Sequence, residues 1–348
     1  MRGLMKTVND GDVFLGMLPG GTQVMAAAQD HGQALLTSED AFVEAQSRFD
    51  RQARVNLSYD IAPVTLPMYF DYVSSQVLAW SPEEIGDLQK ILVDIAHSFV
   101  PLNVPLPPVV ILVKTTGLEE GYAAYTRKDN VIVLPENMVA SLQASTGFND
   151  PLHPGTSTAY LQAVVTHELF HILSKNNPVV RARLYGLVNY RVMGNTVVLP
   201  EVPWGPTGAM LTDLKITNPD TPALDVYINM LVPATPGGEE GSSLTRSLLP
   251  ILLASGPYQG GIFFNYLQWL FMAVQQNDEG VWAPLVNGAG IPLIYDSAPL
   301  VPQYLSMVGR NFTNEIFHPD EILAQSFVLI AQQPSLDLLE RVGAALSR

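Results

Sequence analysis

Apolar residues recur every three or four positions over several stretches of the chain, which is the spacing of helices with one buried face. The clearest case begins at the capping box Ser81-Pro82-Glu83-Glu84 and ends near Phe99, before the next proline. Further helices are predicted over residues 37–54, 156–175, 178–187, 258–276 and 319–333, and a last one from residue 335 to the C-terminus.

Short apolar runs between turn residues predict strands in the first half of the chain. Residues 109–113 form one such run, and residues 122–126 and 131–134 form two more that a polar turn joins. The order is therefore a helix, then strands, then mostly helices. We predict an α+β fold with a small mixed or antiparallel sheet and a mostly helical C-terminal half.

The composition fits a globular chain with a sizeable core, and it excludes several classes of function. Hydrophobic residues make up 47% of the 348 residues, which is ordinary for a packed domain. The formal net charge is −15, so we expect no nucleic-acid partner and no docking on anionic membranes, because both need clustered Lys and Arg. The most hydrophobic stretch, residues 262–274, is too short to span a bilayer.

The chain contains no cysteine. This excludes disulfides, thiolate nucleophiles, iron–sulfur clusters and zinc sites with Cys ligands. The first residues carry two early positive charges but no apolar run of the length that a signal peptide needs. The protein is therefore either cytoplasmic or secreted or periplasmic after removal of a signal, and we favour the second location. The sequence leaves the oligomeric state open.

One predicted helix carries a pattern typical of a metal site. His167 and His171 are four residues apart, so their imidazoles project from one face of the helix and can converge on one zinc ion. Glu168 lies about 100° round the helix, where it can take a proton from a metal-bound water without occupying the metal. The alternative is a pair of ordinary histidines, but a buried pair is costly unless something binds it.

This segment resembles the HExxH zinc metallopeptidases, the zincins. The extended motif of the metzincins is absent, because Ser174 and Asn177 stand where it has Gly and His. The segment from His318 onward resembles the second helix of gluzincin-type enzymes, in which a Glu supplies the third ligand. The resemblance implies that Glu321 is this ligand. It follows His171 at a longer interval than in thermolysin-like enzymes, which is compatible with more divergent gluzincins.

Other third ligands stay open. Glu201 follows the motif more closely but lies between prolines, and His318 would give a site with three histidines. His318 can also face the same way as Glu321, where it would stabilise an oxyanion or orient a ligand. The alternative for His318 is an N-cap or a packing role, and for Glu321 it is an acid in the first turn of a helix.

Further residues are candidates for contacts with the substrate. Tyrosines stabilise the oxyanion in some gluzincins. Tyr304 and Tyr295 both lie upstream of Glu321, no spacing selects either of them, and Tyr304 is named as the candidate for that role. Arg310 is a candidate for binding a substrate carbonyl or carboxylate. The Asp that follows the ligand Glu by four residues in thermolysin-type enzymes is replaced by Gln325, so the partner of the histidines is not identified.

The resemblance also implies a strand that binds substrate. In zincins an edge strand beside the cleft pairs with an extended substrate through main-chain hydrogen bonds. The segment before the predicted polar turn fits this role, and it fits an ordinary hairpin strand equally well. Its residues are Tyr122, Ala123, Ala124 and Tyr125.

We therefore expect a zinc-dependent peptidase that binds one Zn²⁺ per chain through His167, His171 and Glu321, with Glu168 as the general base. Its partner would be a peptide or protein substrate. Two alternatives remain, a zincin-fold binding protein without catalysis and a zinc hydrolase of a non-peptide amide.

The predicted domain organisation rests on the strength of the sequence signals and on the resemblance to zincins. Residues 1–80 give weak signals, and we expect them to form a segment that packs on or precedes the catalytic unit. Residues 81–348 would form a zincin-like catalytic domain. Its upper part is expected over 81–177, and its lower, mostly helical part over 178–348.

Overall fold

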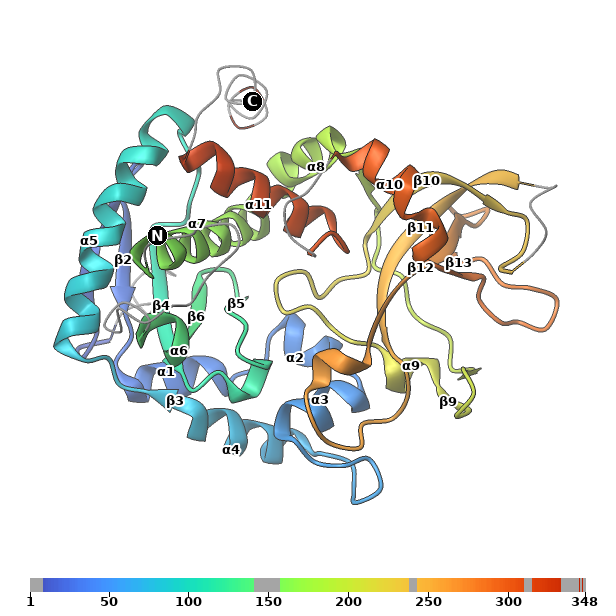
Figure 1. The fold of residues 1–348 in the computed structure, drawn as a ribbon, viewed down its shortest axis with the longest axis horizontal. Coiled ribbons are helices and arrows are strands. Elements are labelled where there is room, and N and C mark those ends of the chain that lie inside the picture. The colour runs from blue at the N-terminus through green and yellow to red at the C-terminus, as the bar shows by residue number, and fades with distance from the viewer. Residues whose placement is uncertain are drawn as a thin grey trace. The chain divides into compact units, whose positions relative to one another are not determined.

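The structure is a computed structural model that describes residues 9–140, 157–237, 243–309 and 315–332, together with residues 344 and 346. The chain divides into two compact units. Unit 1 comprises Met1–Asp40, Thr65–Arg181 and Leu323–Arg348, and unit 2 comprises Ala41–Val64 and Ala182–Ile322. The units are interleaved in sequence, so this division differs from the predicted one at residue 80 (Figure 1).

Unit 1 is built on a six-stranded mixed sheet. Its strands are β1 (Val13–Leu18), β2 (Thr22–Ala26), β3 (Val77–Leu78), β4 (Val109–Thr115), β5 (Tyr125–Arg127) and β6 (Val131–Pro135). The order is β1-β2-β4-β6-β5, and β3 pairs with β4 off this path. The central strands β2, β4 and β6 run parallel, and the other three pair antiparallel. The continuous apolar runs of β4 and β6 are therefore those of buried parallel strands.

The helices of unit 1 confirm most of the predicted boundaries. They are α1 (Gln29–Leu36), α4 (Leu66–Gln76), α5 (Pro82–Phe99), α6 (Glu136–Ala140), α7 (Ser157–Asn176) and the larger part of α11 (Pro319–Gln332), with the short helices η2 (Val100–Leu102) and η3 (Leu118–Glu120). The predicted capping box forms, because Ser81 and Glu84 each accept a hydrogen bond from the other's backbone N–H. Glu84 also pairs with Lys114 of β4 at 2.7 Å, so the first turn of α5 is tied to the sheet.

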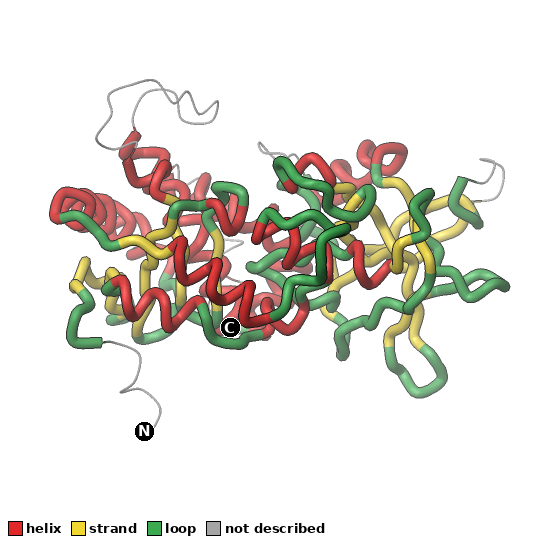
Figure 2. Tube along the Cα trace, turned by 90° about the horizontal axis from the view of Figure 1, so that it is seen from below, coloured by secondary structure: helices red, strands yellow, loops and turns green. Residues whose placement is uncertain are grey.

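Unit 2 contains a second six-stranded sheet, which is antiparallel throughout. Its strands are β7 (Tyr190–Val192), β10 (Val226–Pro233), β11 (Ser243–Ala254), β12 (Leu267–Gln276), β13 (Trp282–Pro284) and β14 (Ile294–Asp296). The order is β13-β12-β11-β10-β7, with β14 also on β12. Between β7 and β10 in the sequence, the chain forms a separate two-stranded ribbon of β8 (Pro203–Trp204) and β9 (Ala209–Met210). Figure 2 shows these strands in yellow.

Short helices complete unit 2. They are α2 (Ala41–Ala45), α3 (Arg48–Val55), the end of α8 (Pro178–Leu187), α9 (Leu211–Leu214) and α10 (Val301–Val308), with η4 (Phe263–Tyr266) and η5 (Ala298–Leu300). The single helix predicted over 37–54 is in fact two. Ser47 starts the second one, because its side chain accepts a hydrogen bond from the Asp50 N–H in a capping box.

The structure confirms the α+β class but corrects the prediction for the C-terminal half. That half is not mostly helical, since it contains all of β7–β14. The helix predicted over 258–276 is wrong, because most of the segment forms η4 and β12. Its continuous apolar run fits either a buried helix or a buried strand. Pairing with β11 from Ser247↔Val274 to Ala254↔Leu267 shows that it is a strand.

The described part of the chain contains no helix with both the length and the apolar character needed to cross a membrane. The last predicted helix, from residue 335, lies outside the described residues apart from positions 344 and 346.

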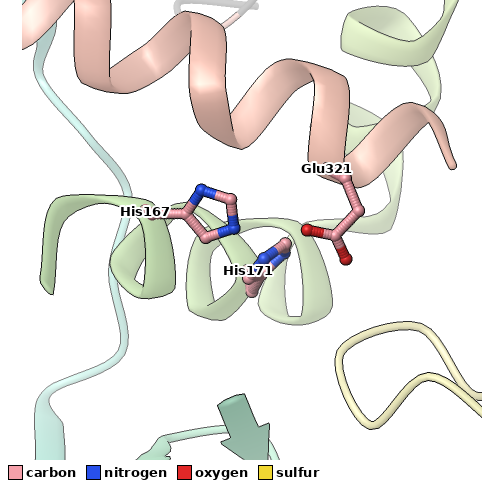
Figure 3. A group of neighbouring side chains, drawn as sticks. All are labelled: His167, His171 and Glu321. Atoms are coloured by element: carbon pink, nitrogen blue, oxygen red, sulfur yellow. The ribbon is translucent and has the colours of Figure 1, made fainter. Parts of the chain in front are cut away.

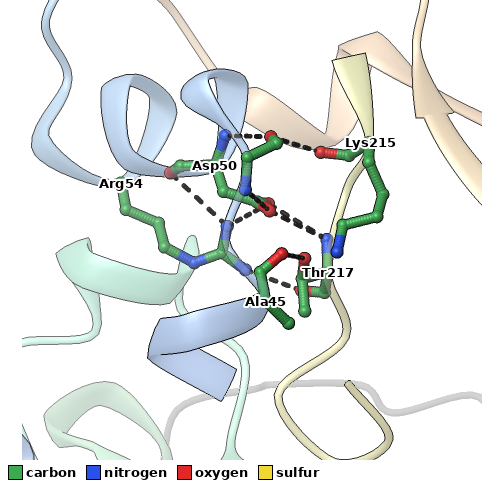
Figure 4. A network of polar contacts seen from close by, with 6 residues as sticks. Ala45, Asp50, Arg54, Lys215 and Thr217 are labelled. Atoms are coloured by element: carbon green, nitrogen blue, oxygen red, sulfur yellow. Dashed lines mark hydrogen bonds and ion pairs between the residues drawn. The ribbon is translucent and has the colours of Figure 1, made fainter. Parts of the chain in front are cut away.

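A buried polar network joins α3 to the segment after α9 in unit 2 (Figure 4). The Asp50 carboxylate accepts a hydrogen bond from Arg54 at 2.7 Å and another from the Thr217 N–H at 3.0 Å. The Arg54 guanidinium in turn donates to the Thr217 carbonyl at 3.1 Å. The Asp50 and Arg54 side chains are essentially inaccessible to solvent, so this network compensates two buried charges within the unit.

Candidate metal centre

Helix α7 carries the two histidines, and its C-terminal turn is anchored to unit 1. Lys175 donates a hydrogen bond from Nζ to the Thr126 hydroxyl of β5 at 2.6 Å. Asn177, just beyond the helix, donates to the Pro105 carbonyl at 2.8 Å. Leu169, on the same helix, is buried in the core. These contacts fix the rotation of α7 about its axis, and with it the direction in which the histidines point.

The two imidazoles lie one above the other on α7, as their spacing predicts. The ring centroids of His167 and His171 are 4.7 Å apart, and the ring planes are inclined by 75°. His171 is fully buried, whereas His167 is partly exposed. An ion or a small molecule from the solvent would therefore reach the two imidazoles from the side of His167.

Helix α11 brings Glu321 to this pair. The division between the units falls within α11, directly after Ile322, but the helix is continuous, and its body belongs to unit 1. Phe327 stacks there against Phe99 of α5, with ring centroids 5.2 Å apart, and against Phe170 of α7 at 5.6 Å. Because a helix transmits position along its axis, this packing also sets the place of Glu321, less than two turns earlier.

His167, His171 and Glu321 each present one ligand atom to a common point (Figure 3). The three atoms lie within 4.8 Å of one another. Tetrahedral zinc with bonds of about 2.0–2.2 Å needs ligand atoms roughly 3.3–3.5 Å apart, so modest side-chain rotations are enough. Two imidazole nitrogens and one carboxylate oxygen are also a donor set that zinc prefers, with one position left for water or substrate. The residues therefore fit a zinc ion.

Glu168 follows the first histidine on the buried side of α7. Its side chain is 4% exposed, and it is adjacent in sequence to one ligand and three residues from the other. A carboxylate so placed can exchange a proton with a molecule bound at the centre.

Asn218 is the residue of this region that sequence reasoning missed. Its side-chain amide donates a hydrogen bond to Oε1 of Glu321 at 2.7 Å. Its own carbonyl oxygen accepts from the Asp220 N–H at 2.9 Å, which fixes the direction of the amide. The sequence around it predicts only a turn. An Asn in a turn that points its NH₂ at the Glu321 carboxylate fixes the direction of that carboxylate, as the partner of a metal ligand would.

The alternatives for the third ligand receive no such support. Among the described residues, neither Glu201 nor His318 belongs to a group whose ligand atoms converge. Glu201 is exposed. His318 is buried, and its Nδ1 accepts a hydrogen bond from the Asp320 N–H at 3.2 Å. This contact at the start of α11 is that of an N-cap.

Two further candidates lie elsewhere or outside the described residues. Tyr304 of α10 is fully buried in unit 2, where its hydroxyl donates to the Ile316 carbonyl at 2.6 Å and accepts from Tyr190 at 3.1 Å. Burial raises the pKa of the Tyr304 hydroxyl far above its ordinary value, so this group stays protonated and structural. Arg310 lies outside the described residues.

The predicted substrate strand is shorter than expected. Only Tyr125 of the segment belongs to β5, which does form one end of the sheet. Tyr122 has a positive φ of 68° and is half exposed, and Ala123 and Ala124 lie between it and the strand. The Tyr125 side chain is buried, with its hydroxyl 3.3 Å from Glu119 Oε1, so a partner at this edge would meet main chain rather than the tyrosine ring.

Comparison with known proteins adds no relative. The chain matches no protein-family model, no curated protein and no solved structure.

Proposed function

We propose that the protein is a zinc-dependent peptidase. One observation carries the proposal: α7 and α11, which come from distant parts of the chain, bring two imidazoles and a carboxylate within 4.8 Å of one another. The spacing of His167, Glu168 and His171 adds the resemblance to HExxH metallopeptidases.

In this proposal His167, His171 and Glu321 hold the metal, and Asn218 holds Glu321. A bound zinc ion would supply an acidified water and polarise the scissile carbonyl. The burial of His171 and Glu321 keeps both groups in place and limits their access to bulk water. The protein contributes a preformed set of donors, so little reorganisation is needed on binding.

Glu168 is the proposed acid–base group. It would accept a proton from the attacking water as the C–O bond forms, and would then deliver a proton to the leaving amine as the peptide C–N bond breaks. A general base must be ionised when it acts, and proximity to a dication would favour that form of Glu168.

Metal analysis and peptide cleavage test the proposal together. The purified protein is expected to bind one zinc per chain and to cleave members of a peptide library at pH 7. His167→Ala should lose both the metal and the cleavage, because two ligands no longer form the site. His97→Ala is the matched control, since His97 is exposed on α5, and it should keep both.

The outcomes separate the alternatives. A protein without specific zinc binding would refute the proposed centre. Stoichiometric zinc with no cleavage across the library would refute the peptidase and leave the binding protein. A protein that binds zinc but hydrolyses only non-peptide amides would be a zinc hydrolase of such amides and not a peptidase.

A further inference from the structure

Unit 2 contains a hollow that adjoins the proposed third ligand. It has a volume of about 430 Å³, part of which is open to solvent. Most of its wall is apolar, with Leu224, Val226, Leu249, Leu252 and Phe317 among the lining residues. Apolar walls with a few polar groups that fix the ligand are typical of small-molecule sites.

Lys215 is among the residues that line the hollow. Among the described residues its ammonium has no hydrogen bond or ion pair, and none ends on it in Figure 4. Burial lowers the pKa of Lys215, and the nearby Asp50 only partly opposes this effect. Asp50 is already paired with Arg54. The three groups together therefore hold one positive charge more than negative charges.

Thr221 adds a second polar group to the same hollow. Its hydroxyl oxygen is buried and has no hydrogen-bond partner among the described residues. A buried hydroxyl without a partner costs free energy. An anion in the hollow would accept a hydrogen bond from this hydroxyl and would give the half-buried Lys215 a counter-ion.

Asn218 joins the hollow to the proposed centre. It lines the hollow and donates its side-chain hydrogen bond to Glu321. A ligand in the hollow is therefore separated from the third metal ligand by a single side chain.

We propose that this hollow is a carboxylate-binding subsite that accepts an acidic side chain of the substrate, with Lys215 as counter-ion and Thr221 as hydrogen-bond donor. A single lysine matches one carboxylate, whereas a phosphate dianion usually needs several cations or a row of backbone N–H groups. The apolar walls match the methylene groups of Glu. The link to a substrate rests on the proposed function, but the binding of a carboxylate does not.

Binding is tested with two small probes, N-acetyl-glutamic acid amide and its neutral isostere N-acetyl-glutamine amide. The protein has six lysines, so the side-chain NMR signal of Lys215 can be assigned by its loss in Lys215→Gln. We expect the glutamic acid probe to shift this signal saturably and the glutamine probe to leave it unchanged. Lys215→Gln should weaken binding of the acidic probe by about 10-fold or more, and Thr221→Val by a smaller factor.

Lys90→Gln is the matched control, because Lys90 lies on the surface of α5 with a side chain that is 76% exposed. It should bind the acidic probe as the wild type does. Equal shifts with both probes, or unchanged binding in Lys215→Gln, would overturn the carboxylate subsite.

A peptide series with Glu or Gln at one position separates this inference from the proposed function. Preferential cleavage of the Glu peptides, lost in Lys215→Gln, supports both. Binding of the acidic probe through Lys215 without any cleavage supports the subsite and refutes the peptidase. Cleavage with no response of the Lys215 signal overturns the subsite and leaves the peptidase in place.

Discussion

Two regions of the molecule bury ionisable side chains, and they do so in different ways. In unit 2, Asp50 takes its partners from the protein itself, namely the Arg54 guanidinium and a backbone N–H. On α7 and α11, the ligand atoms of His167, His171 and Glu321 also lie within 4.8 Å of one another, as a metal site would require.

The difference separates a structural role from a chemical one. A buried charge with a protein counter-charge is satisfied in the folded chain, and removing one partner harms folding. In the proposed function, the ligand groups that converge on one point serve a metal ion from outside the chain. We therefore expect variants of the first region to lose stability, and variants of the second to lose metal or turnover.

Glu168→Gln should produce the largest effect and sharpen this contrast. The amide keeps the shape of the side chain but cannot act as a base, so turnover should fall by about 10²–10⁴-fold. Zinc content and unfolding free energy should stay at wild-type values. Steady-state cleavage and metal analysis check both points.

Glu83→Gln serves as the control, because Glu83 is exposed in the first turn of α5. Undiminished turnover in Glu168→Gln would remove the proposed acid–base role. A large loss of stability in Glu168→Gln would instead show that Glu168 has a structural role.

Arg54→Met should show the opposite behaviour in unit 2. It leaves the Asp50 carboxylate buried without its cation and should lower the free energy of unfolding by about 3–5 kcal/mol. Tryptophan fluorescence during denaturant unfolding measures this, since Trp204, Trp269 and Trp282 all lie in unit 2.

A double variant and a surface variant complete this test. The double variant Arg54→Met with Asp50→Leu should regain much of the free energy of unfolding that Arg54→Met loses, because no uncompensated buried charge then remains. Lys90→Met, which breaks an exposed pair with Asp87, should change stability by about 0.5 kcal/mol at most. Equal losses in the buried and exposed variants would contradict the structural role of the network.

Asn218→Ala tests the hydrogen bond that orients Glu321. Loss of this 2.7 Å contact should weaken zinc affinity by about 10–100-fold, because a freely rotating ligand must be ordered on binding. Competition with a chromophoric chelator measures the affinity. Asn229→Ala is the control, since Asn229 is exposed on β10 and bonds only to Ser247 in the described structure. Identical affinities in the two variants would show that Asn218 has no influence on the centre.

Ser81→Ala should give the smallest effect. It removes one half of the capping box of α5, and stability should fall by about 1 kcal/mol. Ser98→Ala, near the other end of the helix, loses only a bond to the Ile95 carbonyl and should change stability less. Thermal unfolding of the pair checks the difference, and neither variant should alter zinc binding.

The sequence predicts the part of unit 1 from Ser81 to Asn176 well because its signals are local, whereas β1, β2, α1 and α4 lie in residues that give weak signals. The cap at Ser81 and the apolar spacing up to Phe99 give both ends of α5. Unit 2 depends on pairing between distant segments. The residues from Leu267 to Gln276 carry no signal that β11 is their neighbour. Without that neighbour, their apolar run is equally compatible with a helix.

In the candidate metal centre, too, local signals predict some residues and not others. The spacing of His167 and His171 predicts their convergence, since both lie on one helix. The choice of Glu321 needed the resemblance to gluzincins, because no local rule relates it to α7. Asn218 could not be found at all from the sequence, where its surroundings indicate a turn. Its role follows only from a hydrogen bond to a residue much further along the chain.

The order of the segments along the chain has a consequence for biosynthesis. The histidines of α7 leave the ribosome long before α11, which carries the carboxylate that completes their set. A nascent chain can fold the early strands of unit 1 but holds two imidazoles without their third companion until nearly all of unit 2 has been translated. An enzyme of the proposed kind would thus stay inactive while it is being made.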